Sequence, residues 1–214
     1  MPEHPESLAE GADPARDFAA AVQADDLALV RAMLDQDPAL RHRLNDTMPG
    51  LHFGGTPLIA AVNNKNREMV ELLLGAGADV NQKSHWWAGG FGVLDYAVDL
   101  ADFLISRGAT LDACSAARLG RLDALSAIVR ADPRRVHERG GDGKTPLHWA
   151  ATIETAEFLL ENGADIDARD VDHESTPLQY LIREHQDVAR LLVARWADAD
   201  IFAAAALGDL ARAR

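Results

Sequence analysis

The feature that most constrains the fold is a three-residue motif that recurs along the chain. Thr-Pro-Leu occurs three times, beginning at Thr56, Thr145 and Thr176. A threonine hydroxyl can accept a hydrogen bond from the first turn of a helix, and proline at the first helical position loses no N–H that the helix needs. Each motif therefore predicts that a helix begins just after its threonine.

A second signal follows these starts. The apolar segments EMVELLLGAGADVN, LADFLISRGATLD and TAEFLLENGADID each contain a glycine just after the last apolar turn, at Gly77, Gly108 and Gly163. Glycine adopts the left-handed conformation of a helix C-terminal cap without steric strain. The unit is therefore a helix, a short turn, a second helix that ends at glycine, and a polar loop that leads to the next unit.

This pattern resembles the ankyrin repeat. The resemblance is carried by DGKTPLHWAA (142–151), by FLLENGADIDARD (158–170), and by GGTPLIAAV and VELLLGAGADVN at the beginning and end of residues 54–81. It extends over roughly residues 18–214. It implies an all-α solenoid of stacked helix-turn-helix repeats, with β-hairpin or loop fingers projecting from one edge.

The repeats are irregular, and the irregularity itself recurs. Residues 21–38 match residues 116–133, 95 positions further on. We therefore expect a disordered acidic lead-in over residues 1–16, followed by a repeat array over residues 17–214. The array divides into a supermodule at 18–112, a second at 113–201 and a truncated third copy at 202–214. Because the third copy breaks off early, we expect the sequence to be a fragment.

Composition narrows the class of partner. The net charge is −13, and an acidic surface repels nucleic acid and anionic lipid, so neither is expected as a partner. The single cysteine, Cys114, excludes an intramolecular disulfide and is predicted to be a buried thiol. No secretory signal or membrane-spanning segment is recognisable. These observations predict a monomer in the cytoplasm.

The stretch SHWWAGGFG, residues 84–92, is the least ordinary part of the chain. Gly92 stands where a Thr-Pro-Leu threonine is expected, yet the glycine stop at Gly108 follows 16 residues later, against 21 from Thr56 to Gly77. In one interpretation the tryptophans of this stretch fold back and fill the gap left by the short helices.

In the other interpretation Trp86 and Trp87 form an exposed patch with the preceding finger, which carries His52 and Phe53. Adjacent aromatic finger tips are typical of a binding hot spot. We expect one tryptophan of the pair to be buried and the other exposed.

Several residues suggest other chemistry. The histidines His52, His85, His137 and His173 all lie in predicted fingers. Zinc ligands must lie within about 2.0–2.1 Å of the ion, whereas packed helices are about 8–10 Å apart, so no metal site is expected. No catalytic motif and no cofactor-binding motif occurs.

Three further positions are interpreted as structural. His148 follows Thr-Pro-Leu, and the resemblance implies that it braces neighbouring loops by hydrogen bonds. Trp149 is predicted to lie in the core. Trp196 takes the place of Gly163 one repeat later; because tryptophan resists positive φ, the helix before it is expected to end differently.

The resemblance implies a non-enzymatic scaffold that binds a protein or peptide on its fingers and inner helices. An alternative of another class is the N-terminal regulatory or ligand-sensing part of a larger enzyme, which the gene sequence downstream of Arg214 would reveal. The predicted partner-binding residues are His52, Phe53, Asn63, Asn64, His85, Trp86, Trp87, Phe91, Asp142, Lys144, Asp172 and His173.

Overall fold

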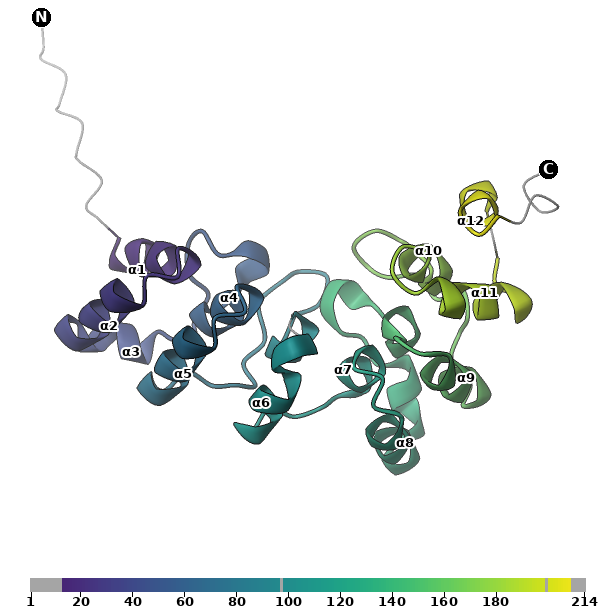
Figure 1. Ribbon diagram of the computed structural model, residues 1–214, viewed down its shortest axis with the longest axis horizontal. Helices are drawn as coiled ribbons and strands as arrows, with labels where there is room; N and C mark the ends of the chain where they lie inside the picture. The colour runs from purple at the N-terminus through teal and green to yellow at the C-terminus, as the bar shows by residue number, and fades with distance from the viewer. Residues whose placement is uncertain (1–12, 97, 199, 209–214) are drawn as a thin grey trace, which may run out of the picture.

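The structure, a computed structural model, describes residues 13–96, 98–198 and 200–208. Within these ranges every regular element is a helix, and none is a β-strand. The helices are paired and stacked into an elongated row (Figure 1). This confirms the predicted all-α solenoid.

The elements follow the chain in order. The N-terminal half contains α1 (Pro14–Gln23), α2 (Leu27–Gln36), α3 (Pro38–His42), η1 (His52–Gly54), α4 (Pro57–Asn63), α5 (Arg67–Ala76), η2 (Val93–Asp95), η3 (Val98–Leu100) and α6 (Ala101–Ser106), where η denotes a 3₁₀ helix. The C-terminal half contains α7 (Ala113–Arg118), α8 (Leu122–Ala131), η4 (Pro133–His137), η5 (Gly141–Gly143), η6 (Pro146–Trp149), α9 (Ile153–Glu161), α10 (Pro177–Leu181), α11 (Gln186–Ala194) and α12 (Ile201–Ala206).

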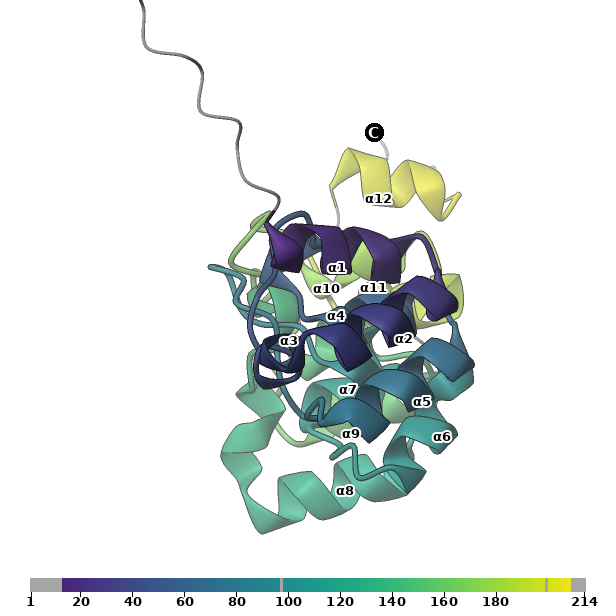
Figure 2. The same ribbon diagram turned by 90° about the vertical axis from the view of Figure 1, so that its left-hand side faces the viewer.

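The pairs form two layers. In Figure 1 the inner helices α1, α4, α7 and α10 lie above their partners α2, α5, α8 and α11. Figure 2, which looks along the row from its N-terminal end, shows the outer helices α2, α5 and α6 one behind another. The inner layer is continuous, because α1 packs on α4, α4 on η2, η2 on α7, α7 on η6 and η6 on α10.

The buried apolar side chains form two clusters. One extends from Ala15 to Ala109 and the other from Ala113 to Leu207. Each cluster joins the facing sides of its own helix pairs, as expected where a repeat packs only on its neighbours. The division into supermodules at 18–112 and 113–201 stays a prediction.

The Thr-Pro-Leu motifs open helices as predicted, but not all of one type. The Thr56 hydroxyl accepts from the Ile59 N–H at 3.4 Å and caps α4, and Thr176 caps α10 in the same way. Thr145 opens the 3₁₀ helix η6 instead. Because 18 positions separate Thr145 from Gly163, against 21 in the unit of Thr56, the inner segment is too short for a full α-helix.

The glycine stops adopt the predicted left-handed conformation, with φ of 109° at Gly77, 97° at Gly108 and 92° at Gly163. The expectation for Trp196 is wrong, because its φ is 72° and it takes the same cap. Its N–H donates to Val193 and that of Ala197 donates to Leu192, which repeats the hydrogen bonds at Gly163. Burial of Ala197 holds the turn despite the tryptophan.

Two details concern the start of the first helix and the form of the fingers. Helix α1 starts at Pro14, three residues before the predicted boundary at residue 17, and the Asp13 carboxylate accepts from the Ala15 N–H at 3.1 Å. The division of the chain at residue 17 stays a prediction. Residues 1–12 of the predicted lead-in and residues 209–214 of the truncated copy lie outside the described residues. The described fingers are loops with 3₁₀ turns rather than paired strands, because one or two backbone hydrogen bonds close each.

Candidate functional site

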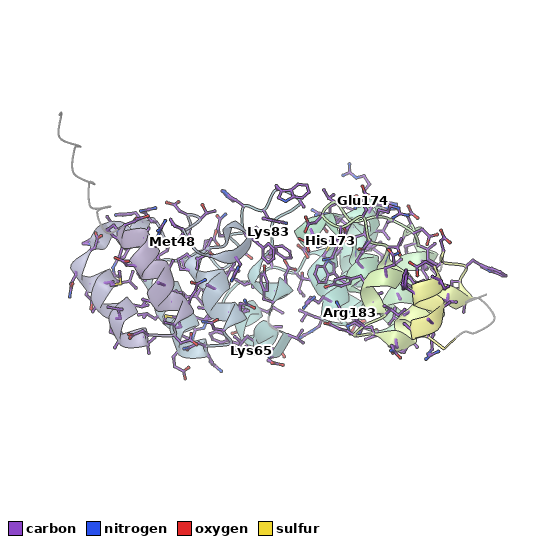
Figure 3. All side chains as sticks on the ribbon, turned by 90° about the horizontal axis from the view of Figure 1, so that it is seen from above. Met48, Lys65, Lys83, His173, Glu174 and Arg183 are labelled. Atoms are coloured by element: carbon purple, nitrogen blue, oxygen red, sulfur yellow. The ribbon has the colours of Figure 1, made fainter. Side chains whose placement is uncertain are left out.

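The fingers form one edge of the molecule. Figure 3 shows Met48, Lys83, His173 and Glu174 along this edge, and the turn residues Lys65 and Arg183 along the opposite one. The first two fingers are joined directly, since the His85 N–H donates to the Gly54 carbonyl at 2.9 Å.

Aromatic rings cover the tips of these two fingers. The Phe53 ring meets Trp86 edge-on, with the centroids 5.0 Å apart, and lies 5.3 Å from Phe91. Phe53 has a φ of 55°, a left-handed conformation that is unusual for phenylalanine, and its side chain remains 41% exposed. The turn thus holds an apolar ring at the surface.

The two tryptophans differ in burial, but neither is fully buried, as one was expected to be. Trp86 is half-buried against Phe53, and its indole N–H is buried without a hydrogen-bond partner. Trp87 is 69% exposed. Trp87 is therefore the largest apolar side chain that the first two fingers offer to another molecule.

The rest of the stretch packs inward. Ala88 and Phe91 are buried, and the Phe91 ring lies against the Cα of Gly141, where any side chain would collide with it. Gly89 approaches the Gly140 backbone equally closely. Residues 84–92 thus contain both a plug and an exposed tip, but the ring that packs between the halves is Phe91 rather than a tryptophan, and the tip is Trp87.

A cavity of about 330 Å³ lies beside the aromatic tips, between the first two fingers and the inner helices. His52 and Phe53 form its finger side. Ile59, Ala60 and Tyr96 form its inner side. Sequence reasoning missed the inner-side residues, although Ala60 and Tyr96 each stand four positions after a helix start, which marks the exposed side of an inner helix.

The two predicted asparagines have different roles. The Asn64 side-chain amide donates to the Gln23 carbonyl at 3.1 Å and to the Asp25 carboxylate at 3.0 Å. Asn64 therefore ties α4 to α1. Asn63 is exposed and lines the cavity, where its amide is accessible.

The predicted residues of the next finger are mostly buried. Phe91, Asp142 and Lys144 all lie in the interior. The Lys144 ammonium lies 2.7 Å from the Asp142 Oδ2 and 4.3 Å from the centroid of the Tyr180 ring. In this structure these side chains hold the fingers together and present little surface to a partner.

One group of metal-donor atoms comes together among the described residues. Donor atoms of Asp142, Asp172 and His173 lie within 4.8 Å of one another, and His173 Nδ1 is 3.4 Å from the Asp172 carboxylate. The Lys144 ammonium already neutralises Asp142. The histidines His52, His85 and His137 are exposed and belong to no such group.

His148 has the bracing role that the resemblance implies. The Thr145 N–H donates to its Nδ1 at 3.1 Å, so the Nε2–H donates to the Ser175 carbonyl at 3.0 Å in the next finger. Burial lowers the pKa of His148 to about 4, which keeps the ring neutral. Cys114 is buried as predicted, and burial raises the pKa of its thiol.

These features define a helical repeat protein, a solenoid in which paired helices stack and one edge carries the loops. The family model for ankyrin repeats (three copies) matches the chain twice, over residues 18–115 and 111–204. The chain therefore belongs to the ankyrin repeat family, whose members are in general protein-binding modules. Within the described residues, no helix combines the length and apolarity needed to cross a membrane.

Proposed function

We propose that this protein is a non-enzymatic scaffold that binds a protein or peptide on the surface formed by its first two fingers and the adjoining inner helices. The observation that carries the proposal is the exposed aromatic tip. Phe53 lines the cavity of about 330 Å³, Trp86 packs on Phe53, and the exposed Trp87 lies next to Trp86. Exposed apolar side chains next to a concave surface are typical of binding hot spots.

The predicted binding residues narrow to those whose side chains are accessible. Trp87 and Phe53 supply apolar contact, the exposed His52 and His85 of the same two fingers add polar groups, and Asn63 adds an amide from the cavity. A hot spot of this kind is an apolar centre within a polar rim. Asp172 and His173 lie two fingers further along and would extend the surface.

The test uses peptides selected from a random displayed library against the purified protein. Trp87→Ser should weaken their binding about 30-fold, the effect of losing roughly 2 kcal/mol at a hot spot, and leave the urea midpoint unchanged. Trp196→Ser is the matched control, because Trp196 is 85% exposed at the end of α11, away from the finger tips. Equal binding by wild type and Trp87→Ser would show that the finger tips are not the binding surface.

A further inference from the structure

A second cavity occupies the place in the C-terminal half that the first occupies in the N-terminal half. It measures about 360 Å³ and lies on the inner helices α7, η6 and α10. Three residues of the first cavity have counterparts in the second: Gln23, Ala60 and Tyr96 correspond to Arg118, Trp149 and Tyr180.

The correspondence follows from position in the repeat. Ala60 and Trp149 each stand four residues after a capping threonine, and Tyr96 and Tyr180 each stand four residues after the cap of their own helix. Likewise, Gln23 and Arg118 both come two residues before the left-handed residue that ends the first inner helix of each half. The cavity is thus a repeated feature of the array.

The two cavities differ in charge. In the first, the Gln23 amide is satisfied, because it donates to the Gly50 carbonyl at 3.0 Å. In the second, Arg118 takes the same place, and its Nε is buried without a hydrogen-bond partner. Within the described residues, no carboxylate oxygen lies within ion-pair distance of Arg118. The second cavity therefore contains a guanidinium that forms no ion pair among the described residues and whose Nε lacks an acceptor.

An aromatic ring packs on this cation, and the Asp95 carboxylate acts on it electrostatically without forming an ion pair with it. The Arg118 guanidinium carbon lies 4.7 Å from the centroid of the Trp149 ring, which restricts the side chain to one orientation. Lys144, on the same aromatic cluster, is already paired with Asp142 at 2.7 Å. Glu184 and His185 also line the cavity, but neither is paired with Arg118.

We propose that the second cavity binds a carboxylate side chain of the partner protein, and that Arg118 receives it. The proposal rests on the protein-binding function proposed above. A planar guanidinium donates two parallel hydrogen bonds to a carboxylate, and a donor that is already oriented loses less entropy on binding. Because the chain carries a net charge of −13, we expect the partner's acidic residue to lie in an otherwise neutral or basic segment.

The experiment compares peptides from the same random library on wild type and on Arg118→Gln, which copies the residue of the first cavity. Selected peptides should contain Asp or Glu and bind Arg118→Gln about tenfold to a hundredfold more weakly. Changing that acidic residue of the peptide to its amide should weaken binding to wild type equally, and should not weaken binding to Arg118→Gln further.

Arg183→Gln is the control, because Arg183 is exposed after α10 and does not line the cavity. It should leave the affinity unchanged, and a loss equal to that of Arg118→Gln would overturn the proposal by showing a general charge effect. If Arg118→Gln lowers the urea midpoint, Arg118→Lys serves as the second variant, because it keeps the charge. It should bind the selected peptides several-fold more weakly than wild type does, because an ammonium cannot donate two parallel hydrogen bonds to a carboxylate.

Failure of this inference can be distinguished from failure of the proposed function. Peptides that depend on Trp87 but bind equally with and without Arg118 would overturn this inference and leave the proposed function intact. If no peptide depends on either residue, both proposals fail.

Discussion

At the scale of the residue, one position in the repeat shows how different side chains perform the same task. In four of the described inner helices the third residue accepts a hydrogen bond from the backbone N–H of the cap. His148 does so for Thr145, Gln179 for Thr176 and Asp95 for Gly92, at 3.1, 3.0 and 2.6 Å. In α7 the acceptor is the Ser115 hydroxyl, 2.9 Å from the Asp112 nitrogen. Because His148 and Asp95 titrate and Gln179 does not, the same position gives the fold a dependence on pH in two of the units.

His148 should make the protein less stable in acid. Its pKa is lowered from 6.5 to about 4 by burial, so its contribution is fully present above pH 6.5 and is lost as the pH falls toward 4. The loss has an upper bound of about 3 kcal/mol. His148→Gln, which copies the residue at position 179, should keep the fold at pH 7 and remove this loss, whereas His148→Leu should lower the urea midpoint at every pH. The prediction is wrong if His148→Gln and wild type lose stability equally between pH 7 and pH 4.

Asp95 should act in the opposite direction. Burial raises the pKa of its carboxyl from 3.8 to about 6, so the folded state favours the protonated form and stability falls as the pH rises from about 4 to about 6. Asp95→Asn keeps an acceptor for the Gly92 N–H and should raise the unfolding free energy at pH 7 by about 1–2 kcal/mol. Urea unfolding at pH 7 and at pH 4 checks this, since the gain should disappear at the lower pH.

Trp196 is strained where Gly163 is not. A left-handed backbone costs a residue with a side chain about 1 kcal/mol or more, and the exposed indole makes no buried contact that would offset it. Trp196→Gly should therefore raise the unfolding free energy by about 1 kcal/mol, and Gly163→Val should lower it by at least as much. A drop in the denaturant midpoint of Trp196→Gly would show that the tryptophan contributes contacts to the folded state.

At the scale of the element, residues 84–92 show why a loop can resist interpretation from sequence. The alternation of glycine and aromatic residues indicates an unusual finger, but the identity of the buried ring depends on Gly141, 50 positions beyond Phe91. A contact of that separation leaves no local pattern. The same holds for Asp142 and Lys144, which the sequence predicts as partner-binding residues and which are buried, with the Lys144 ammonium lying over the distant Tyr180 ring.

The helix starts and stops can be predicted because their causes are local. A capping threonine, a proline at the first turn and a glycine stop act within a few residues, so the predictions at Thr56, Thr176 and Gly77 are confirmed. The prediction at Trp196 is wrong because it considered only the local preference of the residue. Local preference opposes its conformation, and the packing of Ala197 on the array prevails over that preference.

The plug and the tip of residues 84–92 should separate on substitution. Phe91→Ala removes a buried ring and should lower the unfolding free energy by about 3–5 kcal/mol, whereas Trp87→Ala should change it by less than about 0.5 kcal/mol. Gly141→Val should also destabilise, and less so when Phe91 is already alanine, because the ring it meets is gone. Additive effects of Phe91→Ala and Gly141→Val would mean that the two residues do not touch.

At the scale of the whole molecule, the array offers two long faces to a partner. One is the face of the fingers and inner helices, with the aromatic tips and the two repeated cavities. The other is the face of the outer helices, where α2 and α5 border a hollow of about 530 Å³ and α8 and α9 border one of about 430 Å³. Both outer hollows are lined by charged residues of both signs. The one aromatic ring among their lining residues, Phe158, is half-buried, whereas Trp87 and Phe53 are exposed, so we assign the partner to the first face.

Amide hydrogen exchange with and without a selected peptide tests this assignment most directly. A bound peptide excludes water from the backbone it covers and stabilises the fingers it joins. The account predicts slower exchange in residues 48–55 and 84–92, with residues 67–76 and 122–131 of the outer helices unchanged. Slower exchange confined to the outer helices, with the two aromatic fingers unaffected, would contradict it.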